Sequence, residues 1–197
     1  MSTNIRMIEA AKQSDERKIR LLVAAGDDVN CETPGRETPL HYASARGCVD
    51  VIRALIAFGA KIHARDSYGC TPILWAAEAG KMSSVKFIAR HYKNDKFETD
   101  FIGKTPLHYA ALSGDYETVR YFLKRSENIN AQTERGDTAM HFAVKNRKPD
   151  IVKLLLDAGA EFVIANKNGE SPLHLAVDSD NGEIIEMMMA RVYRTSV

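Results

Sequence analysis

The sequence predicts an all-α fold built from repeated units of two helices, and three observations lead to this prediction. A six-residue block that starts with Thr or Ser and ends in Ala occurs five times, at almost constant intervals along the chain. Each block carries the signals that start a helix, and an apolar stripe with helical spacing follows it. Finally, 45% apolar and 27% charged residues among 197 are the composition of a folded protein.

The first helix of each unit is expected to begin at the block. A Thr or Ser hydroxyl can accept a hydrogen bond from a free backbone N–H at a helix start, and the Pro that usually follows has the φ of a first helical turn. One further interval before the first block leads to Ile5, where residues 7–11 match only the apolar and alanine positions. This degenerate first repeat brings the number of units to six. The five clear blocks begin at Thr38, Thr71, Thr105, Thr138 and Ser171.

The rest of each unit predicts a turn, a second helix and a hairpin. Gly47, Gly80 and Gly114 stand nine residues after the Thr, where a left-handed residue would end a short helix. Apolar pairs such as Ile151/Val152 and Leu155/Leu156 then form one face of a second helix. Turn-forming residues precede the next block, as in residues 166–169, and predict a tight hairpin.

At this level of detail the sequence resembles the ankyrin repeat. The resemblance rests on the run Gly103-Lys104-Thr105-Pro106-Leu107-His108-Tyr109-Ala110-Ala111, on Gly114 after it, and on the ending Asp157-Ala158-Gly159-Ala160. It implies stacked helix–turn–helix units with short β-hairpin fingers, forming a curved solenoid with a concave binding face. It also implies one domain over residues 1–197, with repeats at about 1–32, 33–65, 66–99, 100–132, 133–165 and 166–197.

The sequence departs from the ankyrin pattern at several places. Arg36 stands where the finger glycine is expected, Leu74 replaces the histidine of the block, and Arg147 replaces the glycine between the two helices. Residues 91–97 lack the Gly-Ala ending and are one residue longer, and residues 178–182 are interpreted as an insertion in the last unit. The third repeat and its finger are therefore expected to be the least regular.

Charge and cysteine content limit the classes of function. With 27 basic and 26 acidic residues the net charge is +1, which disfavours a nucleic acid or an anionic membrane as partner. No signal peptide and no apolar run of about 18 residues is present. The odd number of cysteines, Cys31, Cys48 and Cys70, favours reduced thiols, with Cys70 expected to be exposed in a finger. We therefore expect a cytoplasmic or nuclear protein, or one found in both compartments.

The histidines of the blocks invite a metal-binding interpretation, which their spacing argues against. Each of them lies at the same place in a different unit, and packed helices are ~8–10 Å apart, whereas Zn–N bonds are ~2 Å. We expect each histidine to bond the backbone of its own and the adjoining finger instead. We expect no metal and no cofactor, and because no catalytic motif is present, we expect no enzyme. The four histidines are His41, His108, His141 and His174.

The ankyrin resemblance implies that a protein partner docks on the concave positions before each Thr and at the end of each first helix. Apolar residues at these positions cluster in the third and fourth units, with charges around them, which is the anatomy of a protein interface. The sequence thus predicts a monomeric, non-enzymatic interaction module acting as an adaptor, scaffold or inhibitor. Its apolar centre is Tyr68, Phe101, Ile102 and Leu112, and its rim is Arg46, Glu78, Lys104 and Arg135.

Three alternatives stay open. Phe101 and Ile102 could instead steady the finger, with Trp75 and Tyr109 simply packed on the inner helices. In that case the chain is a structural spacer without a dedicated partner.

The other two alternatives concern modification and the chain end. Asn30 and Asn130 resemble the ankyrin position modified by an asparaginyl hydroxylase, although an asparagine there also suits a hairpin, and His63 takes the same place in its own unit. The run Thr195-Ser196-Val197 has the pattern that PDZ domains accept at a carboxyl terminus.

Overall fold

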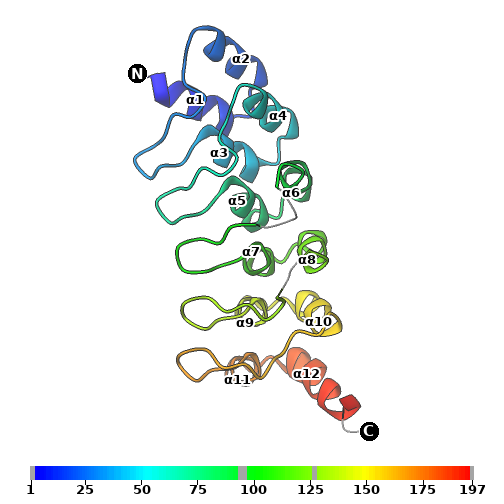
Figure 1. Cartoon of the computed structure of the whole chain (residues 1–197). Coiled ribbons are helices and arrows are strands. Elements are labelled where there is room, and N and C mark those ends of the chain that lie inside the picture. The colour runs from blue at the N-terminus through cyan, green and yellow to red at the C-terminus, as the bar shows by residue number, and fades with distance from the viewer. Residues whose placement is uncertain (1–2, 93–96, 126–127, 196–197) are drawn as a thin grey trace. The chain divides into compact units, whose positions relative to one another are not determined.

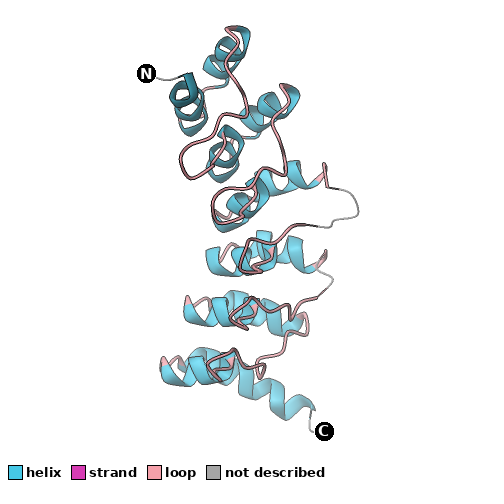
Figure 2. Ribbon diagram, turned by 60° about the vertical axis from the view of Figure 1, so that its left-hand side comes forward, coloured by secondary structure: helices cyan, strands magenta, loops and turns pink. Residues whose placement is uncertain are grey.

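The computed structural model describes residues 3–92, 97–125 and 128–195. These residues form twelve α-helices joined by loops, and none of them is assigned to a β-strand (Figure 2). The all-α prediction is thus confirmed. Contacts divide the chain into two compact units, Met1–Phe101 and Ile102–Val197, and each is described by itself. No helix in the described ranges has the length and apolarity needed to cross a membrane.

The first unit contains three pairs of antiparallel helices arranged in two rows (Figure 1). The odd-numbered helices pack on one another in one row, and the even-numbered helices pack on one another in the other row. Loops project beyond the odd-numbered row (Figure 1). The helices are α1 (Thr3–Lys12), α2 (Glu16–Ala24), α3 (Pro39–Arg46), α4 (Val49–Ala57), α5 (Pro72–Glu78) and α6 (Met82–Ala89).

The second unit repeats this arrangement with three further pairs (Figure 1). Its last helix, α12, has 14 residues and is longer than α8 and α10, which have 8 and 9. The helices are α7 (Pro106–Ser113), α8 (Tyr116–Leu123), α9 (Ala139–Lys145), α10 (Pro149–Asp157), α11 (Pro172–Asp178) and α12 (Gly182–Thr195).

The predicted helix starts are confirmed, and the block histidine takes part in them. At Thr38, Thr105, Thr138 and Ser171 the side chain faces the backbone N–H three residues on, while the histidine at that third position accepts from the cap's own N–H. This reciprocal pair satisfies two backbone donors that a helix start otherwise leaves free. The block is thus a capping box in which histidine replaces the usual Glu or Gln.

The core of each unit lies between the two rows of helices. In the first unit the largest fully buried side chains include Leu40, Ile52, Leu55 and Ile73, and in the second they include Met140, Ile151, Leu155 and Ile184. Most of these residues belong to the apolar stripes that predict the helices. Burial of each such side chain contributes about 1.5–3 kcal/mol, so the stripes are the main source of stability.

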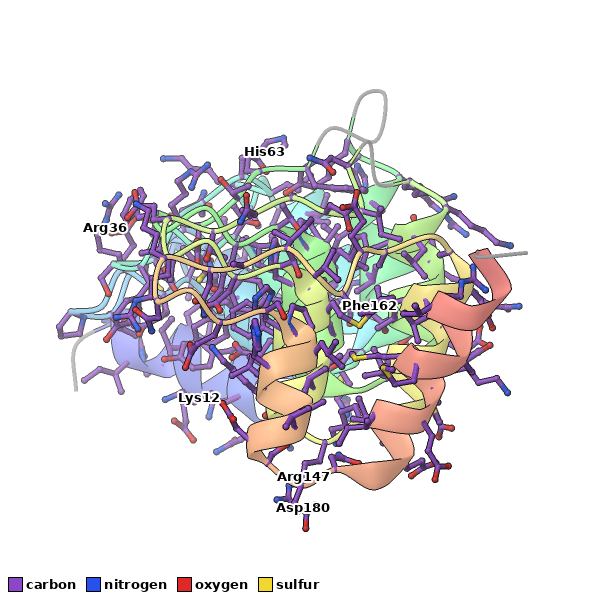
Figure 3. The ribbon with its side chains drawn as sticks, turned by 90° about the horizontal axis from the view of Figure 1, so that it is seen from below. Lys12, Arg36, His63, Arg147, Phe162 and Asp180 are labelled. Atoms are coloured by element: carbon purple, nitrogen blue, oxygen red, sulfur yellow. The ribbon has the colours of Figure 1, made fainter. Side chains whose placement is uncertain are left out.

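The turn between the two helices of a repeat uses one left-handed residue. Gly47 and Gly114 hold this place with φ near +80°, as predicted, but Arg147 and Asp180 also adopt positive φ, of 51° and 49°. Asp180 lies one repeat length after Arg147, and α12 begins one repeat length after α10. The interpretation of residues 178–182 as an insertion is therefore wrong, because they are the normal turn with Asp in place of Gly. Figure 3 shows Arg147 and Asp180 at this end of the second unit, where the Arg147 guanidinium donates to the Ser179 carbonyl (3.2 Å).

The fingers are tight turns rather than stranded hairpins. In the finger before α5, the Asp66 N–H donates to the Cys70 carbonyl (3.0 Å) and the Gly69 N–H donates to the Asp66 carbonyl (3.0 Å). The same two bonds occur around Thr133 and Asn166 in the second unit. Arg36, with φ of 63°, occupies the place that Gly69 fills, as the sequence predicts. Because four residues close each turn, no ladder long enough for a strand develops.

The third repeat is irregular at the residues where the sequence departs from the ankyrin pattern. Leu74 is fully buried and has no ring nitrogen, so the Thr71 hydroxyl lacks the histidine partner that Thr38 and Thr105 have. After α6, Tyr92 is buried and packs edge-on against His63, with ring centroids 4.7 Å apart. His63 in turn contacts the Glu98 carboxylate at 2.7 Å. This cluster takes the place of the missing Gly-Ala ending.

Candidate protein-binding surface

Two exposed aromatic side chains stand at neighbouring finger tips of the first unit. Tyr68 is 74% exposed and Phe101 is 57% exposed, and the Phe101 N–H donates to the Tyr68 carbonyl at 3.0 Å. The Asp66 carboxylate fixes the Tyr68 turn by accepting from the N–H of Tyr68 (2.9 Å) and of Cys70 (2.8 Å). The backbone that carries the two rings is therefore held in place while the rings face solvent.

Phe101 also packs on its own unit. Its ring lies directly against Gly69, since a Cβ built on that glycine would meet the ring at 2.6 Å. The Arg65 guanidinium lies 5.8 Å from the ring centroid and donates to the carbonyls of Gly69 and Thr99, each at 2.8 Å. One side of the Phe101 ring thus steadies the finger and the other side is open. Tyr68 has the larger exposed fraction of the two.

The odd-numbered helices of the first unit add a half-buried aromatic pair. Trp75 and Tyr42 meet edge to face with ring centroids 5.3 Å apart, and the Trp75 indole N–H donates to Asp66 (2.9 Å). The Lys12 ammonium lies 4.6 Å from the Tyr42 centroid. Trp75 is thus oriented by a buried carboxylate, in agreement with the interpretation of Trp75 as a packed inner-helix residue.

The second unit carries a comparable aromatic pair on its odd-numbered helices. Tyr109 is buried and Phe142 is half-buried, and the Lys104 ammonium lies 5.3 and 5.4 Å from their ring centroids. Ile102 is 41% exposed at a finger tip and Leu112 is half-buried in α7. The predicted apolar residues of this unit are therefore less exposed than Tyr68 and Phe101.

A buried polar network supports the finger of the second unit. Asp137 accepts hydrogen bonds from Lys145 and from the Asn166 amide, each at 3.0 Å. Burial by itself raises the pKa of the Asp137 carboxyl, but these bonds and the Lys145 charge outweigh burial, so the pKa lies below its ordinary value. Asp137 is thus an anion at neutral pH, and the network fixes the base of the finger.

The predicted rim residues lie at the surface, in both units. Arg46 and Glu78 are exposed at the ends of α3 and α5. Arg135 is exposed in a finger, and its backbone carbonyl accepts a hydrogen bond from the Lys167 N–H (2.9 Å). Of the eight predicted residues, four belong to each unit. The structure brings Tyr68 and Phe101 together within the first unit, and the patch as a whole stays a prediction.

Tyr42 and Phe142 were missed by the sequence reasoning, although a signal for them is present. The fifth position of the block is aromatic in four of the five clear blocks, at Tyr42, Trp75, Tyr109 and Phe142. This recurrence on one face of the first helices indicates an aromatic row within each unit.

Asn30 and Asn130 both tie one repeat to the next. Asn30 donates to the Gly59 carbonyl (3.0 Å) and accepts from the Lys61 N–H (2.8 Å). Asn130 likewise accepts from the Glu161 N–H (2.9 Å) and donates to its carboxylate (3.1 Å). Both side chains are half-buried and bond the following repeat rather than their own hairpin, and hydroxylation stays a prediction. Ser196 and Val197 of the PDZ-type end lie outside the described residues.

The cysteines are shielded from solvent to different degrees. Cys70 is only 7% exposed, so the expectation of an exposed thiol is wrong, because Gly69 and Cys70 turn into the base of the finger. Burial, with the nearby Asp28 and Asp27 carboxylates, raises the pKa of the Cys31 thiol to about 11. Within the described ranges, no group of three His, Cys, Asp or Glu side chains is placed to hold a metal ion.

The repeated capping boxes, paired helix rows and linked fingers define an ankyrin-repeat protein, and the comparisons agree. The family model described as "Ankyrin repeats (3 copies)" matches residues 7–100, 60–133, 75–166 and 107–195. The chain therefore belongs to the ankyrin repeat family. Ankyrin repeat domains are typically protein–protein interaction modules.

Several known proteins are similar to this chain over part or most of its length. The human ASB11 ankyrin repeat domain matches with a TM-score of 0.83 and 28% identity, over 94% of this chain and 82% of that one. "Ankyrin repeat domain-containing protein 63" from Homo sapiens is 34% identical over 77 residues, 39% of this chain and 20% of that protein. "Cyclin-dependent kinase 4 inhibitor B" from Bos taurus is 31% identical over 84 residues, 42% of this chain and 64% of that protein. The match to the first of these curated relatives thus spans about a fifth of its length.

Proposed function

We propose that this chain is a single, non-enzymatic binding domain that acts as an adaptor, scaffold or inhibitor by docking a partner protein on its fingers. The observation that carries the proposal is the pair Tyr68 and Phe101, exposed by 74% and 57% on finger tips that share a backbone hydrogen bond. Large aromatic rings in water cost solvation free energy that the fold does not recover, so their exposure on a rigid turn favours a partner.

The charged neighbours fit the rim of such an interface. Arg46 and Glu78 are exposed at the ends of α3 and α5 in the same unit, and they carry opposite charges. Rim charges contribute to specificity and association rate more than to affinity. We propose that the second unit also contacts a partner, through Ile102, Lys104, Leu112 and Arg135.

The experiment compares proteins captured from cells by the wild-type chain and by Tyr68→Ala, Phe101→Ala and Leu21→Ala. Leu21 is 71% exposed on α2, away from the fingers, and is the matched control for loss of an exposed apolar side chain. A protein captured by the wild type and by Leu21→Ala, but lost with Tyr68→Ala, supports the proposal. Calorimetry with that partner should then show a loss of ~2 kcal/mol or more in binding.

Melting curves of the same variants separate binding from stability. Tyr68→Ala should leave the melting temperature nearly unchanged, because most of its side chain is in water. No specific capture by the wild type would favour the structural spacer, and equal capture by all variants would place the interface away from Tyr68 and Phe101. Loss of capture only with Lys167→Ala or Glu170→Ala would place the interface on the last finger.

A further inference from the structure

Basic side chains gather on the even-numbered helices of the first unit. α2, α4 and α6 together contain five Lys and Arg residues against two acidic ones. The corresponding helices of the second unit contain four basic and five acidic residues. The whole chain is nearly balanced, with 27 basic and 26 acidic residues. The net charge therefore hides a local excess of positive charge on one surface.

Three of these cations occupy equivalent positions in consecutive repeats. Arg20, Arg53 and Lys86 are each the fifth residue of their helix, and all three are exposed. The residue before each is buried, so the fifth position points away from the core. Helix α2 packs beside α4, and α4 beside α6 (Figure 1). The three side chains, called the basic row below, thus lie on neighbouring helices of one face.

Aromatic rings hold the two arginines of the basic row. The Arg20 guanidinium carbon lies 5.7 Å from the Phe58 ring centroid, and that of Arg53 lies 5.1 Å from the Phe87 centroid. Each arginine therefore reaches over a ring of the following repeat, which favours an extended side chain and lowers the entropy lost on binding. The Arg20 guanidinium forms an ion pair with the Glu16 carboxylate at 2.7 Å. Among the described residues, no carboxylate lies within ion-pair distance of Arg53 or Lys86.

We propose that the basic row is a second docking site, which takes an extended acidic segment of a partner protein. Packed helices are ~8–10 Å apart, and an extended chain in the polyproline II conformation advances about 3.1 Å per residue with three residues per turn, so every third side chain lies on the same side. Acidic side chains at every third position of the segment therefore match the spacing of the row. Carboxylates suit these cations because a guanidinium can bind both oxygens of one carboxylate.

Nucleic acid is the less suitable occupant. Tight non-specific binding to a duplex neutralises about 6–10 phosphates, whereas the basic row offers three cations on separate helices. The site is distinct from the fingers, which project beyond the odd-numbered helices (Figure 1). The inference therefore does not depend on the function proposed for Tyr68 and Phe101.

The test measures fluorescence anisotropy of a labelled peptide with Glu at every third position, separated by Gly and Ser, at ~50 mM salt, where screening is weak. The same peptide with Gln in place of Glu is the ligand control. The test variant is Arg53→Gln with Lys86→Gln. Its matched control is Arg120→Gln with Lys153→Gln, which removes the same charges from the same helix position in α8 and α10.

The wild type should bind the Glu peptide and not the Gln peptide. The test variant should weaken binding at least about fivefold and the matched control less than about twofold, because only one pair lies in the basic row. Equal weakening by both variants, or no binding by the wild type, would overturn the proposal. The proposal would also be overturned if single-stranded DNA displaced the labelled peptide at a lower concentration than the unlabelled peptide does. If the test variant loses helix by circular dichroism, Arg53→Lys with Lys86→Arg replaces it and should retain binding.

Discussion

The Nε2 atom of His41 lies 3.0 Å from the carbonyl oxygen of Cys70, which joins helix α3 to the finger of the next repeat. On its other side the Nδ1 atom accepts from the Thr38 N–H at 3.1 Å. One neutral imidazole therefore accepts within its own repeat and donates to the next. His108 and His141 make the same pair of contacts in the second unit, as the sequence predicts.

This arrangement predicts that stability falls as the pH is lowered from ~7 to ~5. Burial lowers the pKa of both His41 and His141, so the folded protein binds a proton less readily than the unfolded chain, whose histidines titrate near 6.5. The unfolded state therefore takes up more protons below that pH, and the free energy of unfolding decreases. Urea denaturation at a series of pH values measures this.

His141→Asn is the control for the pH effect. Asparagine can still accept from the Thr138 N–H but does not titrate, so its pH dependence should be shallower than that of the wild type over the same range. The Asp137 carboxyl does not interfere, because its pKa is lowered below its ordinary value and its contribution is lost only in stronger acid. An unchanged slope would show that the His141 imidazole does not contribute to the effect.

Two finger glycines should respond differently to the same substitution. Gly69 and Gly169 both have φ near +80°, but a Cβ on Gly69 would lie 2.8 Å from the backbone nitrogen of Phe101, whereas a Cβ on Gly169 meets nothing within 4 Å. Gly169→Ala should cost about 1 kcal/mol for the left-handed backbone alone. Gly69→Ala should cost at least ~1 kcal/mol more, because a backbone atom cannot move aside as a flexible side chain can. Chemical denaturation of both variants gives the comparison, and equal losses would contradict the close approach of Phe101.

The repeat architecture was predictable because its signals are local. Each Thr or Ser cap, its histidine and the left-handed turn are fixed by bonds within a few residues, so Thr105 and His108 reveal their roles in the sequence. The fate of Cys70 was not predictable in this way, since its burial depends on how Asp66 folds the finger inward. The half-exposed Phe101 is a similar case, because its contact with Gly69 comes from the preceding repeat.

Arg147→Gly should stabilise the protein by about 0.5–1 kcal/mol. A non-glycine residue at φ of 51° has a strained left-handed backbone, and glycine removes that strain. Glycine also raises the conformational entropy of the unfolded chain, which offsets part of the gain in stability. The bond from Arg147 to the Ser179 carbonyl is exposed, so its loss offsets little of the gain. Gly114→Ala at the equivalent turn is the control and should destabilise by about 1 kcal/mol, since the nearby Lys148 side chain is flexible and can move. A fall in stability on Arg147→Gly would show that the guanidinium contributes more than the backbone strain costs.

Removal of metal ions should leave the fold unchanged. Three of the four block histidines, His41, His108 and His141, use both ring nitrogens on backbone groups, so a metal ion would have to break those bonds first. Dialysis against a chelator should therefore not alter the melting temperature. A drop of several degrees that is reversed by added zinc would contradict this expectation.

Hydroxylation of Asn30 and Asn130 should leave their hydrogen bonds to the next repeat intact. Hydroxylation at the β carbon adds one oxygen and leaves the amide that bonds Gly59 and Lys61, or Glu161, intact. Chain isolated from cells that contain an asparaginyl hydroxylase should gain the mass of one oxygen per modified site, with the melting temperature preserved. Asn30→Ala, by contrast, removes both bonds and should cost about 1–3 kcal/mol because the Lys61 N–H loses its acceptor. The double variant Asn30→Ala with Asn130→Ala is the control for the mass measurement, since it removes both predicted sites. A mass gain that survives in this variant would place the modification elsewhere, and no gain in the wild type would leave the bonds between repeats as the sole role of these residues.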